Sequence, residues 1–285
     1  MTLLELGTRI ESHEIVRFVA AGGMCLVYEA RSMGGTKSVA IKVLHEMWLS
    51  DREITQRFLN EANVLRTMHH PNIVRLSSAG ILPSGQPYMI LEWLPLHLAD
   101  LLHARQAGLG PKLAVRISIQ LARALVHLHA QNVVHRDIKA ANVLLDSQDI
   151  ATATVRLADL GLAKVAPERR SLAGMNVSTG HGKQFGTWDY MAPEQWIKSK
   201  TVDAKADVYS LGVLLFQMIS GGLPFVADDD NQIMSMHLFE APPLKRLGAE
   251  VFPALRALLG RMLDKLSKKR PTMNEVLERL EEMAN

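Results

Sequence analysis

The sequence is that of a mixed-charge globular chain. It has 285 residues, 48% of them hydrophobic, which is enough for one large domain or two modest lobes. The 32 basic and 29 acidic residues are scattered along the chain and give a net charge of +3, so we expect a solvated surface and no nucleic-acid-binding face. The single cysteine, Cys25, excludes an internal disulfide and indicates a reducing compartment. With neither a membrane span nor a signal peptide in view, we expect a cytoplasmic protein.

The first predicted elements are strands separated by a glycine turn. Apolar runs at 15–19 and 26–30 flank Gly22 and Gly23, and a third strand, 38–44, is apolar except for Lys42. Taken alone, that lysine would usually lie on a solvated strand face; together with the glycine turn before it, Lys42 becomes a candidate phosphate ligand. Cys25, at the tip of the turn, is either a small apolar filler or an exposed redox-sensitive thiol.

A helix is predicted over 51–68, with Asp51 as its N-cap, because apolar residues recur there at spacings of three and four. Glu61 lies beside that apolar stripe, either as a surface glutamate or as a functional one. Strands are then expected to start in 70–76 and to occupy 88–94, before Pro95. We place the boundary between a strand-rich half (13–94) and a second half (95–282) at that proline.

The second half is predicted to be helical around one short hairpin. A helix over 113–128 follows Pro111, and the apolar runs Val143–Leu145 and Val155–Leu157 form the hairpin. Asp137, Asn142 and Asp159 lie near this hairpin, and their hard oxygen atoms suit Mg²⁺. Such groups are what phosphoryl transfer requires, because the protein's contribution there is positioning and charge neutralisation.

Two motifs around the hairpin resemble those of protein kinases. His135-Arg136-Asp137-Ile138-Lys139-Ala140-Ala141-Asn142 is similar to the catalytic loop, and Asp159-Leu160-Gly161 resembles the metal-binding Asp-Phe-Gly segment, with Leu in place of Phe. Together and in this order they are a specific signal.

Further segments extend the resemblance over roughly 13–280. The strand 39–42 is similar to the Val-Ala-Ile-Lys strand, and 57–62 resembles the helix whose glutamate, here Glu61, pairs with the strand lysine. The segment 186–194 resembles the Gly-Thr-Pro-x-Tyr-x-Ala-Pro-Glu closure, with Trp188 replacing proline. In 269–272, Arg270 matches the arginine that pairs with the equivalent of Glu194.

Details such as Ala192-Pro193-Glu194-Gln195 identify the chain as similar to the eukaryotic-like (Hanks-type) serine/threonine kinases of bacteria. The resemblance implies an α+β, bilobal fold in one protein-kinase domain over 1–285. Its smaller N-lobe (13–94) would be β-rich with one main helix, and its larger C-lobe (95–282) mostly helical. The implied activity is transfer of the γ-phosphoryl group of ATP to Ser/Thr hydroxyls of protein substrates, with Mg²⁺, or alternatively Mn²⁺, as the metal.

The resemblance also implies residue roles. Lys42 would contact the phosphates of ATP in the cleft between the lobes, Glu61 would hold that lysine, and Asp137 would take the acceptor's proton. Lys139 would lie near the transferring phosphoryl group, and Thr187 would brace this loop. Metal binding is assigned to Asn142 and Asp159, and nucleotide binding to Ala20, Gly22, Gly23, Val27, Ala40, Lys42, Glu92, Leu94 and Leu144.

The glycine turn departs from the family pattern, because Ala20 and Cys25 occupy two of its three glycine positions. This predicts a stiffer lid or weaker nucleotide affinity, and it motivates a pseudokinase scaffold as the alternative function. A small-molecule kinase is disfavoured by the Ala192-Pro193-Glu194 closure, which is a feature of kinases that act on proteins.

Regulation by autophosphorylation is a separate hypothesis. Arg57, Arg136 and Lys164 occupy positions where related kinases gather a phosphate on the loop before the closure. Ser178 and Thr179 are the first candidates as acceptors and Ser171 the next, and a homodimer would allow modification in trans. The alternative is that these hydroxyls only keep the loop solvated.

Overall fold

The structure is a computed structural model that describes residues 3–160, 187–197 and 202–284. Its Cα positions form two compact units, a strand-rich one and a helical one. The strand-rich unit comprises 3–69 and 74–94 of the described chain, and the helical unit comprises His70–Ile73 and the described residues from Pro95 onward.

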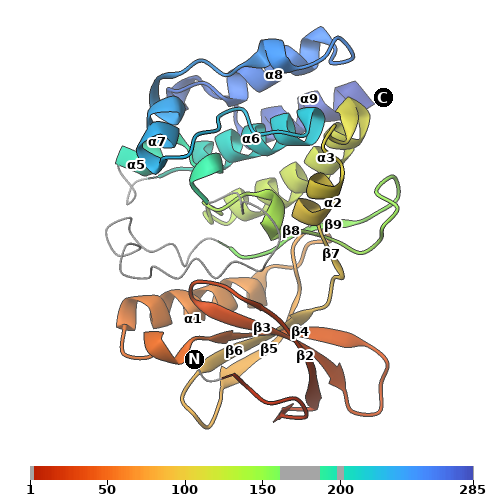
Figure 1. Ribbon diagram of the computed structural model, residues 1–285, viewed down its shortest axis with the longest axis vertical. Helices are drawn as coiled ribbons and strands as arrows, with labels where there is room; N and C mark the ends of the chain where they lie inside the picture. The colour runs from red at the N-terminus through yellow and green to blue at the C-terminus, as the bar shows by residue number, and fades with distance from the viewer. Residues whose placement is uncertain (1–2, 161–186, 198–201, 285) are drawn as a thin grey trace. The chain divides into compact units, whose positions relative to one another are not determined.

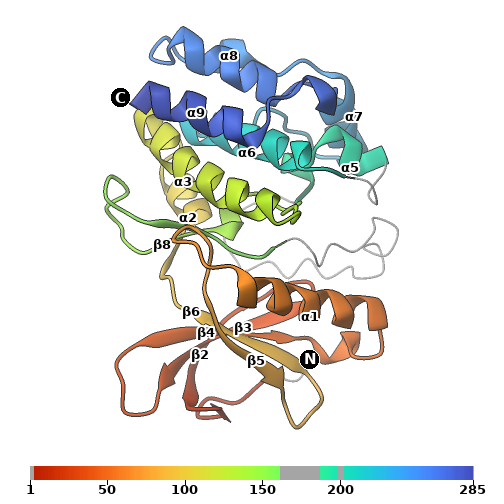
Figure 2. The ribbon, with the colours of Figure 1, turned by 180° about the vertical axis from the view of Figure 1, so that it is seen from behind.

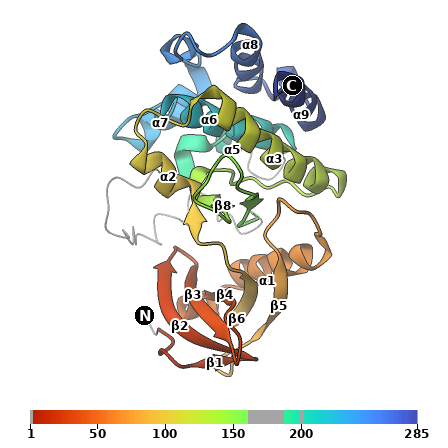
Figure 3. The same ribbon diagram turned by 90° about the vertical axis from the view of Figure 1, so that its right-hand side faces the viewer.

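The strand-rich unit contains one curled antiparallel sheet (Figure 3). Its six strands lie in the order β1-β2-β3-β4-β6-β5. The predicted strand at 38–44 is confirmed residue for residue. The core of this unit is built from buried side chains such as Ile15, Leu26, Tyr28 and Ile90. The strands are β1 (Arg9–Ile10), β2 (His13–Ala21), β3 (Cys25–Ser32), β4 (Ser38–Leu44), β5 (Leu76–Ile81) and β6 (Pro87–Glu92).

Helix α1 (Arg52–Thr67) follows a short 3₁₀ turn, η1 (Glu46–Trp48). Asp51 caps it as predicted: its side chain accepts hydrogen bonds from the backbone N–H groups of Glu53 (3.0 Å) and Ile54 (3.2 Å). The apolar stripe is buried, and it includes Phe58 at 2% exposure. Glu61 belongs to this buried side of the helix and is itself only 2% exposed, so it is not a surface glutamate.

The segment 70–76 was predicted to start a strand, but only its last residue is in one, because β5 begins at Leu76. For residues 70–75 the prediction is wrong. The segment His70–Ile73 belongs to the helical unit instead. The Asn72 amide donates to Gln120 Oε1 (3.0 Å) and to the carbonyl of Val155 (2.8 Å), and Ile73 forms a β-bridge with Leu157. These bonds tie the segment to a helix and a strand of the helical unit.

The helical unit is built around α6 (Lys205–Ser220), in which every residue from Ala206 to Ile219 is buried. Figures 1 and 2 show α6 packed against α3 (Gly110–Ala130), α8 (Pro253–Met262) and α9 (Met273–Ala284). In the part of the chain that the structure describes, no helix combines the length and the apolar character needed to cross a membrane. The other helices are α2 (Leu98–Ala104), α5 (Pro193–Ile197) and α7 (Asp230–Phe239).

The predicted hairpin is confirmed as β8 (Val143–Leu145) paired antiparallel with β9 (Val155–Leu157), and β7 (Leu96–His97) completes a three-stranded sheet. The described part of this unit also contains short 3₁₀ turns. They are η2 (Ala140–Asn142), η4 (Thr187–Tyr190), η6 (Leu244–Arg246) and η7 (Ser267–Lys269).

Candidate active site

In the strand-rich unit, Lys42 and Glu61 form a partly buried ion pair. Lys42 Nζ donates to Glu61 Oε1 at 3.1 Å and to Oε2 at 3.2 Å, with side-chain exposures of 12% and 2%. A buried carboxylate requires a partner of this kind, because removing it from water is otherwise costly. The pair therefore joins β4 to α1 and fixes the direction of the lysine.

Four of the predicted nucleotide-binding residues share one face of the sheet. Ala20 pairs with Val27 across β2 and β3, and Val27 pairs with Lys42 across β3 and β4. Directly opposed residues of an antiparallel pair point to the same side, and so do residues two apart on one strand, which adds Ala40. Ala20, Val27 and Ala40 are all half-buried on this face.

The glycine turn between β2 and β3 is tied down by two side chains that the sequence analysis missed. His45 Nε2 lies 2.9 Å from the carbonyl oxygen of Gly22, and Trp48 Nε1 donates to the carbonyl of Gly23 at 2.9 Å. Both come from the segment just after β4. These two bonds hold the backbone of the turn, whose stiffness stays a prediction, and the aromatic residues after 44 were their only sequence signal.

Cys25 is buried, with 7% of its surface exposed, because it opens strand β3. The expectation of an exposed thiol at the tip of the turn is therefore wrong, and the apolar-filler interpretation holds. Glu92 ends β6, where its carboxylate accepts the backbone N–H of Arg75 at 2.8 Å, and Leu94 beyond it is buried.

In the helical unit, one loop brings together three of the predicted residues. Asn142 Nδ2 donates to both the carboxylate of Asp137 (3.0 Å) and its backbone carbonyl (2.8 Å), and Lys139 Nζ lies 3.1 Å from the same carboxylate. The Asp137 side chain is thus held between an amide and an ammonium group. Leu144, predicted to bind nucleotide, follows on β8 and is half-buried.

His135 ties this loop to the strand end that carries Asp159. Its Nδ1 accepts the backbone N–H of Asp137 (3.2 Å), so its proton is on Nε2, which lies 3.1 Å from the carbonyl of Ala158. Burial lowers the pKa of His135, with Asp207, Asp137 and the Ala158 carbonyl opposing it, and the ring is neutral. The N–H of Ala158 bonds in turn to the carbonyl of Asn142 at 2.9 Å.

The carboxylate that organises this loop is Asp207, at the start of α6 and fully buried. It accepts the backbone N–H groups of His135 and Arg136, each at 2.8 Å, and lies 2.8 Å from His129 Nε2. Burial by itself would raise the pKa of Asp207, but the hydrogen bonds and the nearby histidines outweigh it and lower the pKa. This role was not predicted, since nothing in the apolar run around Asp207 indicates its partners.

Two residues of the site adopt the left-handed backbone conformation that favours glycine: Arg136 with φ 64° and Asp159 with φ 55°. Such conformations cost free energy and persist where surrounding bonds enforce them, as the bonds to Asp207 do for Arg136. Asp159 is exposed, and the residue before it is fixed by His135 and Asn142.

The residues present fit a divalent cation of the magnesium type. The Asn142 amide nitrogen makes both bonds to Asp137, so the amide oxygen is the atom this side chain can offer a metal. With the Asp159 carboxylate this gives two hard oxygen donors, and Mg²⁺ is commonly held by one or two protein oxygens together with substrate phosphates and water.

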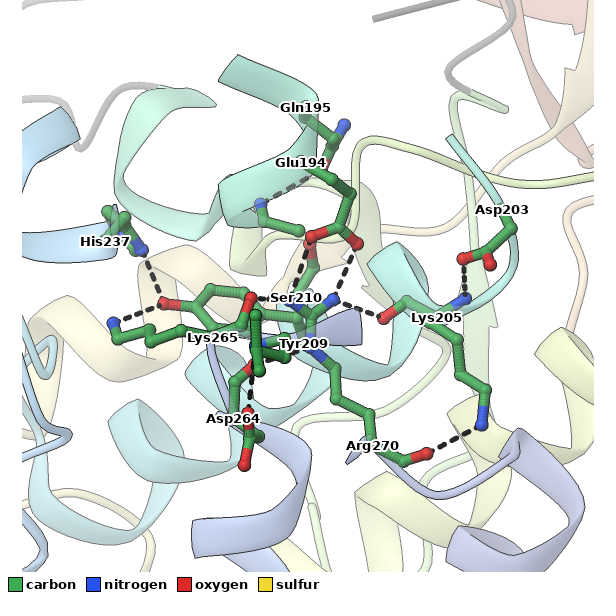
Figure 4. A network of polar contacts seen from close by, with 12 residues as sticks. Glu194, Gln195, Asp203, Lys205, Tyr209, Ser210, His237, Asp264, Lys265 and Arg270 are labelled. Carbon is green, nitrogen blue, oxygen red and sulfur yellow. Dashed lines mark hydrogen bonds and ion pairs between the residues drawn. The ribbon is translucent and has the colours of Figure 1, made fainter. Parts of the chain in front are cut away.

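The closure segment contacts the loop of Asp137 from a second side. Gln195 Nε2 donates to the carbonyl of Arg136 at 3.1 Å, and the backbone of Ala140 bonds to the hydroxyl of Tyr190. The predicted pair of Arg270 with Glu194 is present, at 2.6 and 2.8 Å (Figure 4). The side chain of Thr187 lies outside the described residues, as do Lys164, Ser171, Ser178 and Thr179.

Comparison with known proteins finds similarity to protein kinases over nearly the whole chain. The family model described as "Protein kinase domain" matches residues 13–280. Serine/threonine-protein kinase pkn3 of Myxococcus xanthus is 30% identical over 93% of this chain and 48% of its own length. PknB of Mycolicibacterium smegmatis is 32% identical over 91% of this chain and 40% of its own length. The DNA damage-responsive serine/threonine-protein kinase RqkA of Deinococcus radiodurans is 34% identical over 94% of this chain and 39% of its own length.

The chain thus spans less than half the length of these three curated relatives. Among solved structures, a double mutant of the Mycobacterium tuberculosis PknI kinase domain superposes with a TM-score of 0.73 at 24% identity, covering 99% of this chain and 100% of the other. That likeness supports the bilobal kinase fold. The chain belongs to the protein kinase family and, within it, is similar to the bacterial Hanks-type serine/threonine kinases.

Proposed function

We propose that this chain transfers the γ-phosphoryl group of ATP to serine or threonine hydroxyls of protein substrates. The observation that carries the proposal is the Asp137 carboxylate, held at 3.0 Å by Asn142 and at 3.1 Å by Lys139 within one loop. Phosphoryl transfer depends on positioning and on charge neutralisation rather than on covalent chemistry by the protein. A fixed carboxylate next to a fixed ammonium group supplies both.

Each residue has a defined part in this proposal. Asp137 orients the acceptor hydroxyl and takes its proton, and Lys139 stabilises the negative charge that develops on the phosphoryl oxygens. Lys42, aimed by Glu61, contacts the phosphates of ATP. The half-buried face of Ala20, Val27 and Ala40 receives the adenine and ribose.

Asn142 and Asp159 would hold Mg²⁺, with Mn²⁺ as the alternative. When bound, such a cation would neutralise part of the phosphate charge. Asn142 would then have two functions, because its amide nitrogen also fixes Asp137.

Activation by autophosphorylation is part of the same proposal. Arg136 Nε is buried and has no hydrogen-bond partner among the described residues, which supports a role in binding an anion. A phosphate on Ser178, Thr179 or Ser171 would supply that anion, in trans within a homodimer. A cytoplasmic location, for which the single cysteine Cys25 is the support, completes the proposal.

The alternative is a pseudokinase scaffold, which Ala20 and Cys25 in the glycine turn favour. Against it, Lys42, Glu61, Asp137, Asn142 and Asp159 are all present, and Lys42 is paired with Glu61. The two functions differ in one measurable property, catalytic turnover.

The test is radiolabelled phosphate transfer to a protein substrate by the unaltered chain and by three variants. Asp137→Ala should lower the rate by ~10²–10⁴-fold, the usual contribution of a positioned acid or base. Asp137→Asn should also be inactive but bind nucleotide nearly normally, and Asp159→Ala should be inactive with weakened nucleotide binding. Equal transfer by the unaltered chain and Asp137→Ala would contradict the proposal, as would nucleotide binding without any transfer.

A further inference from the structure

A polar chain of three residues runs through the core of the helical unit, from Lys265 through Tyr209 to His237 (Figure 4). Tyr209 and His237 are both 0% exposed. Lys265 Nζ lies 3.3 Å from the Tyr209 hydroxyl and donates to the carbonyl of Met236 at 3.1 Å. The Tyr209 hydroxyl lies 2.9 Å from His237 Nδ1.

The chemistry of these groups fixes the direction of the hydrogen bonds. An ammonium group can only donate, so the Tyr209 oxygen accepts from Lys265; its hydroxyl proton finds a partner when it is directed to His237 Nδ1, and we adopt that direction. The imidazole proton must then be on Nε2. The ring is neutral, because burial, with a smaller effect from the Lys265 charge, lowers the pKa of His237 to about 3.

Helix α7, which carries His237, packs against the η4 turn of the closure segment, so we consider the Nε2 atom in relation to that turn. It is fully buried and makes no hydrogen bond of ordinary length and angle within the described chain. The backbone of Asp189 nevertheless raises the pKa of His237, against the larger effect of burial. This is the effect expected of a carbonyl oxygen that lies opposite a ring N–H. Asp189 belongs to η4, so the far end of the polar chain points at η4.

The η4 turn contacts the loop of Asp137. Tyr190, next to Asp189, bonds through its hydroxyl to Gln217 at 2.5 Å and to the backbone of Ala140, and its carbonyl accepts the hydroxyl of Ser210 at 2.7 Å. Ala140 opens the η2 turn that ends in Asn142. A displacement of η4 would therefore be passed to the residues that hold Asp137.

We infer that His237 is a positioning residue for phosphoryl transfer. Its Nε2–H, directed by Tyr209 and Lys265, holds the backbone of Asp189 and with it the η4 turn against the loop of Asp137. The inference rests on the proposed function for its kinetic consequence, whereas the holding of η4 can be measured without any activity.

The competing explanation is that His237 only fills space, since its ring also packs edge-on against Phe225 with centroids 5.0 Å apart. Two substitutions separate the explanations. His237→Leu keeps an apolar side chain but removes both polar atoms. His237→Gln supplies an amide oxygen that can accept from Tyr209 and an amide N–H that can donate to Asp189.

The first measurement is hydrogen–deuterium exchange of the whole chain. The Met191 amide is bonded to the carbonyl of Trp188 at 3.1 Å, so it reports on η4. Exchange in peptides covering 187–192 should rise in His237→Leu and stay near the unaltered level in His237→Gln. Peptides from the hairpin 143–157 should not change in either variant. Unchanged exchange at 187–192 in His237→Leu would overturn the inference, and so would equal increases in both variants.

The second measurement is steady-state kinetics of the same proteins. We expect kcat to fall by ~10²-fold in His237→Leu, the scale of a small misplacement of catalytic groups, with KM for ATP unchanged. His237→Gln should recover most of that loss. An equal loss in the two variants would indicate packing alone and contradict the inference. Should the unaltered chain itself show no Asp137-dependent transfer, the proposed function fails, and the exchange data alone decide what His237 does.

Discussion

Each unit contains an ion pair that joins segments far apart in the sequence, and the two pairs differ in what surrounds the cation. Lys42 and Glu61 meet at 3.1 Å with the lysine side chain 12% exposed. Arg270 and Glu194 meet at 2.6 Å with the arginine side chain 0% exposed. One cation can be reached by solvent and the other cannot.

The arginine is also fully used inside the protein. Besides two bonds to Glu194, its guanidinium donates to the backbone carbonyls of Asp264 (2.7 Å), Lys205 (3.0 Å) and Lys265 (3.3 Å). These bonds occupy all of the N–H donors that a guanidinium has. It lies over the Tyr209 ring as well, at 4.8 Å from the centroid. Arg270 has no donor left for a ligand, so its contribution is to hold the closure segment in place.

The comparison separates two uses of a buried pair. In the Arg270 pair, three backbone carbonyls accept hydrogen bonds from the cation in addition to the carboxylate. Replacing both members of the pair therefore still removes those three bonds. In the Lys42 pair, the Glu61 carboxylate depends on the cation, and the lysine side chain stays partly exposed. Breaking the Arg270 pair should therefore mainly lower stability, and breaking the Lys42 pair should mainly lower activity.

The largest effect is expected for Arg270→Met, which should lower the free energy of unfolding by about 5 kcal/mol, the upper range for breaking a buried ion pair by removing one partner. The double variant Arg270→Met/Glu194→Met should recover little, because the carbonyls of Asp264, Lys205 and Lys265 each lose the hydrogen bond that Arg270 donated. Urea denaturation of the single and double variants measures this. A double variant as stable as the unaltered chain would show that the carbonyl bonds contribute nothing.

The second effect is expected for Lys42→Met. It should lower phosphate transfer by ~10²–10³-fold, the usual loss on removing one preorganised donor to a developing negative charge. It should also destabilise the chain by about 3 kcal/mol, since the Glu61 carboxylate loses its cation in a buried position.

The matched control here is Lys42→Met/Glu61→Gln. Neutralising the carboxylate should restore most of the stability while leaving the chain inactive, the reverse of what is expected for the Arg270 pair. Recovery of transfer in the double variant would show that Lys42 serves only to neutralise Glu61.

Local and periodic features of the fold were predictable from the sequence. The N-cap at Asp51 and the hairpin of β8 and β9 each depend on residues within a few positions of one another. The loop residues Asp137, Lys139 and Asn142 meet for the same reason, since all lie within one short turn. Motif spacing alone could indicate these contacts.

Among features that depend on distant partners, the pairs Lys42–Glu61 and Arg270–Glu194 were expected from the family resemblance, and others were missed or wrong. Asp207 holds the backbone of His135, and Tyr209 meets His237, across gaps that no periodicity spans. The sequence left Cys25 open between an apolar filler and an exposed thiol, and the pairing of β3 with β4, which buries it, decides for the filler. Asn72 was assigned to the start of a strand, whereas its amide bonds hold it in the helical unit. In each case tertiary contacts override local preference.

The smallest effect concerns Lys265, which shares the surroundings of Arg270. Burial, with the nearby Arg270 charge, lowers the pKa of Lys265 from 10.5 to about 8. Between these values the unfolded chain binds a proton that the folded chain does not, so this group makes stability rise as pH increases from about 8. Below pH 8 the lysine is charged in both states, and its desolvation is a constant cost to the folded protein.

Replacing the side chain isolates this dependence. The stability of Lys265→Met relative to the unaltered chain should be highest near pH 7 and should decline as pH rises from about 8 to about 10. The reason is that only the unaltered chain becomes more stable as Lys265 loses its proton. Urea denaturation across that range measures the difference. Lys268→Met, at an exposed lysine in the η7 turn, controls for the removal of one positive charge from this region. A flat profile for Lys265→Met would mean that the crowding of positive charge around Arg270 is relieved by solvent, which would narrow the contrast between the two ion pairs.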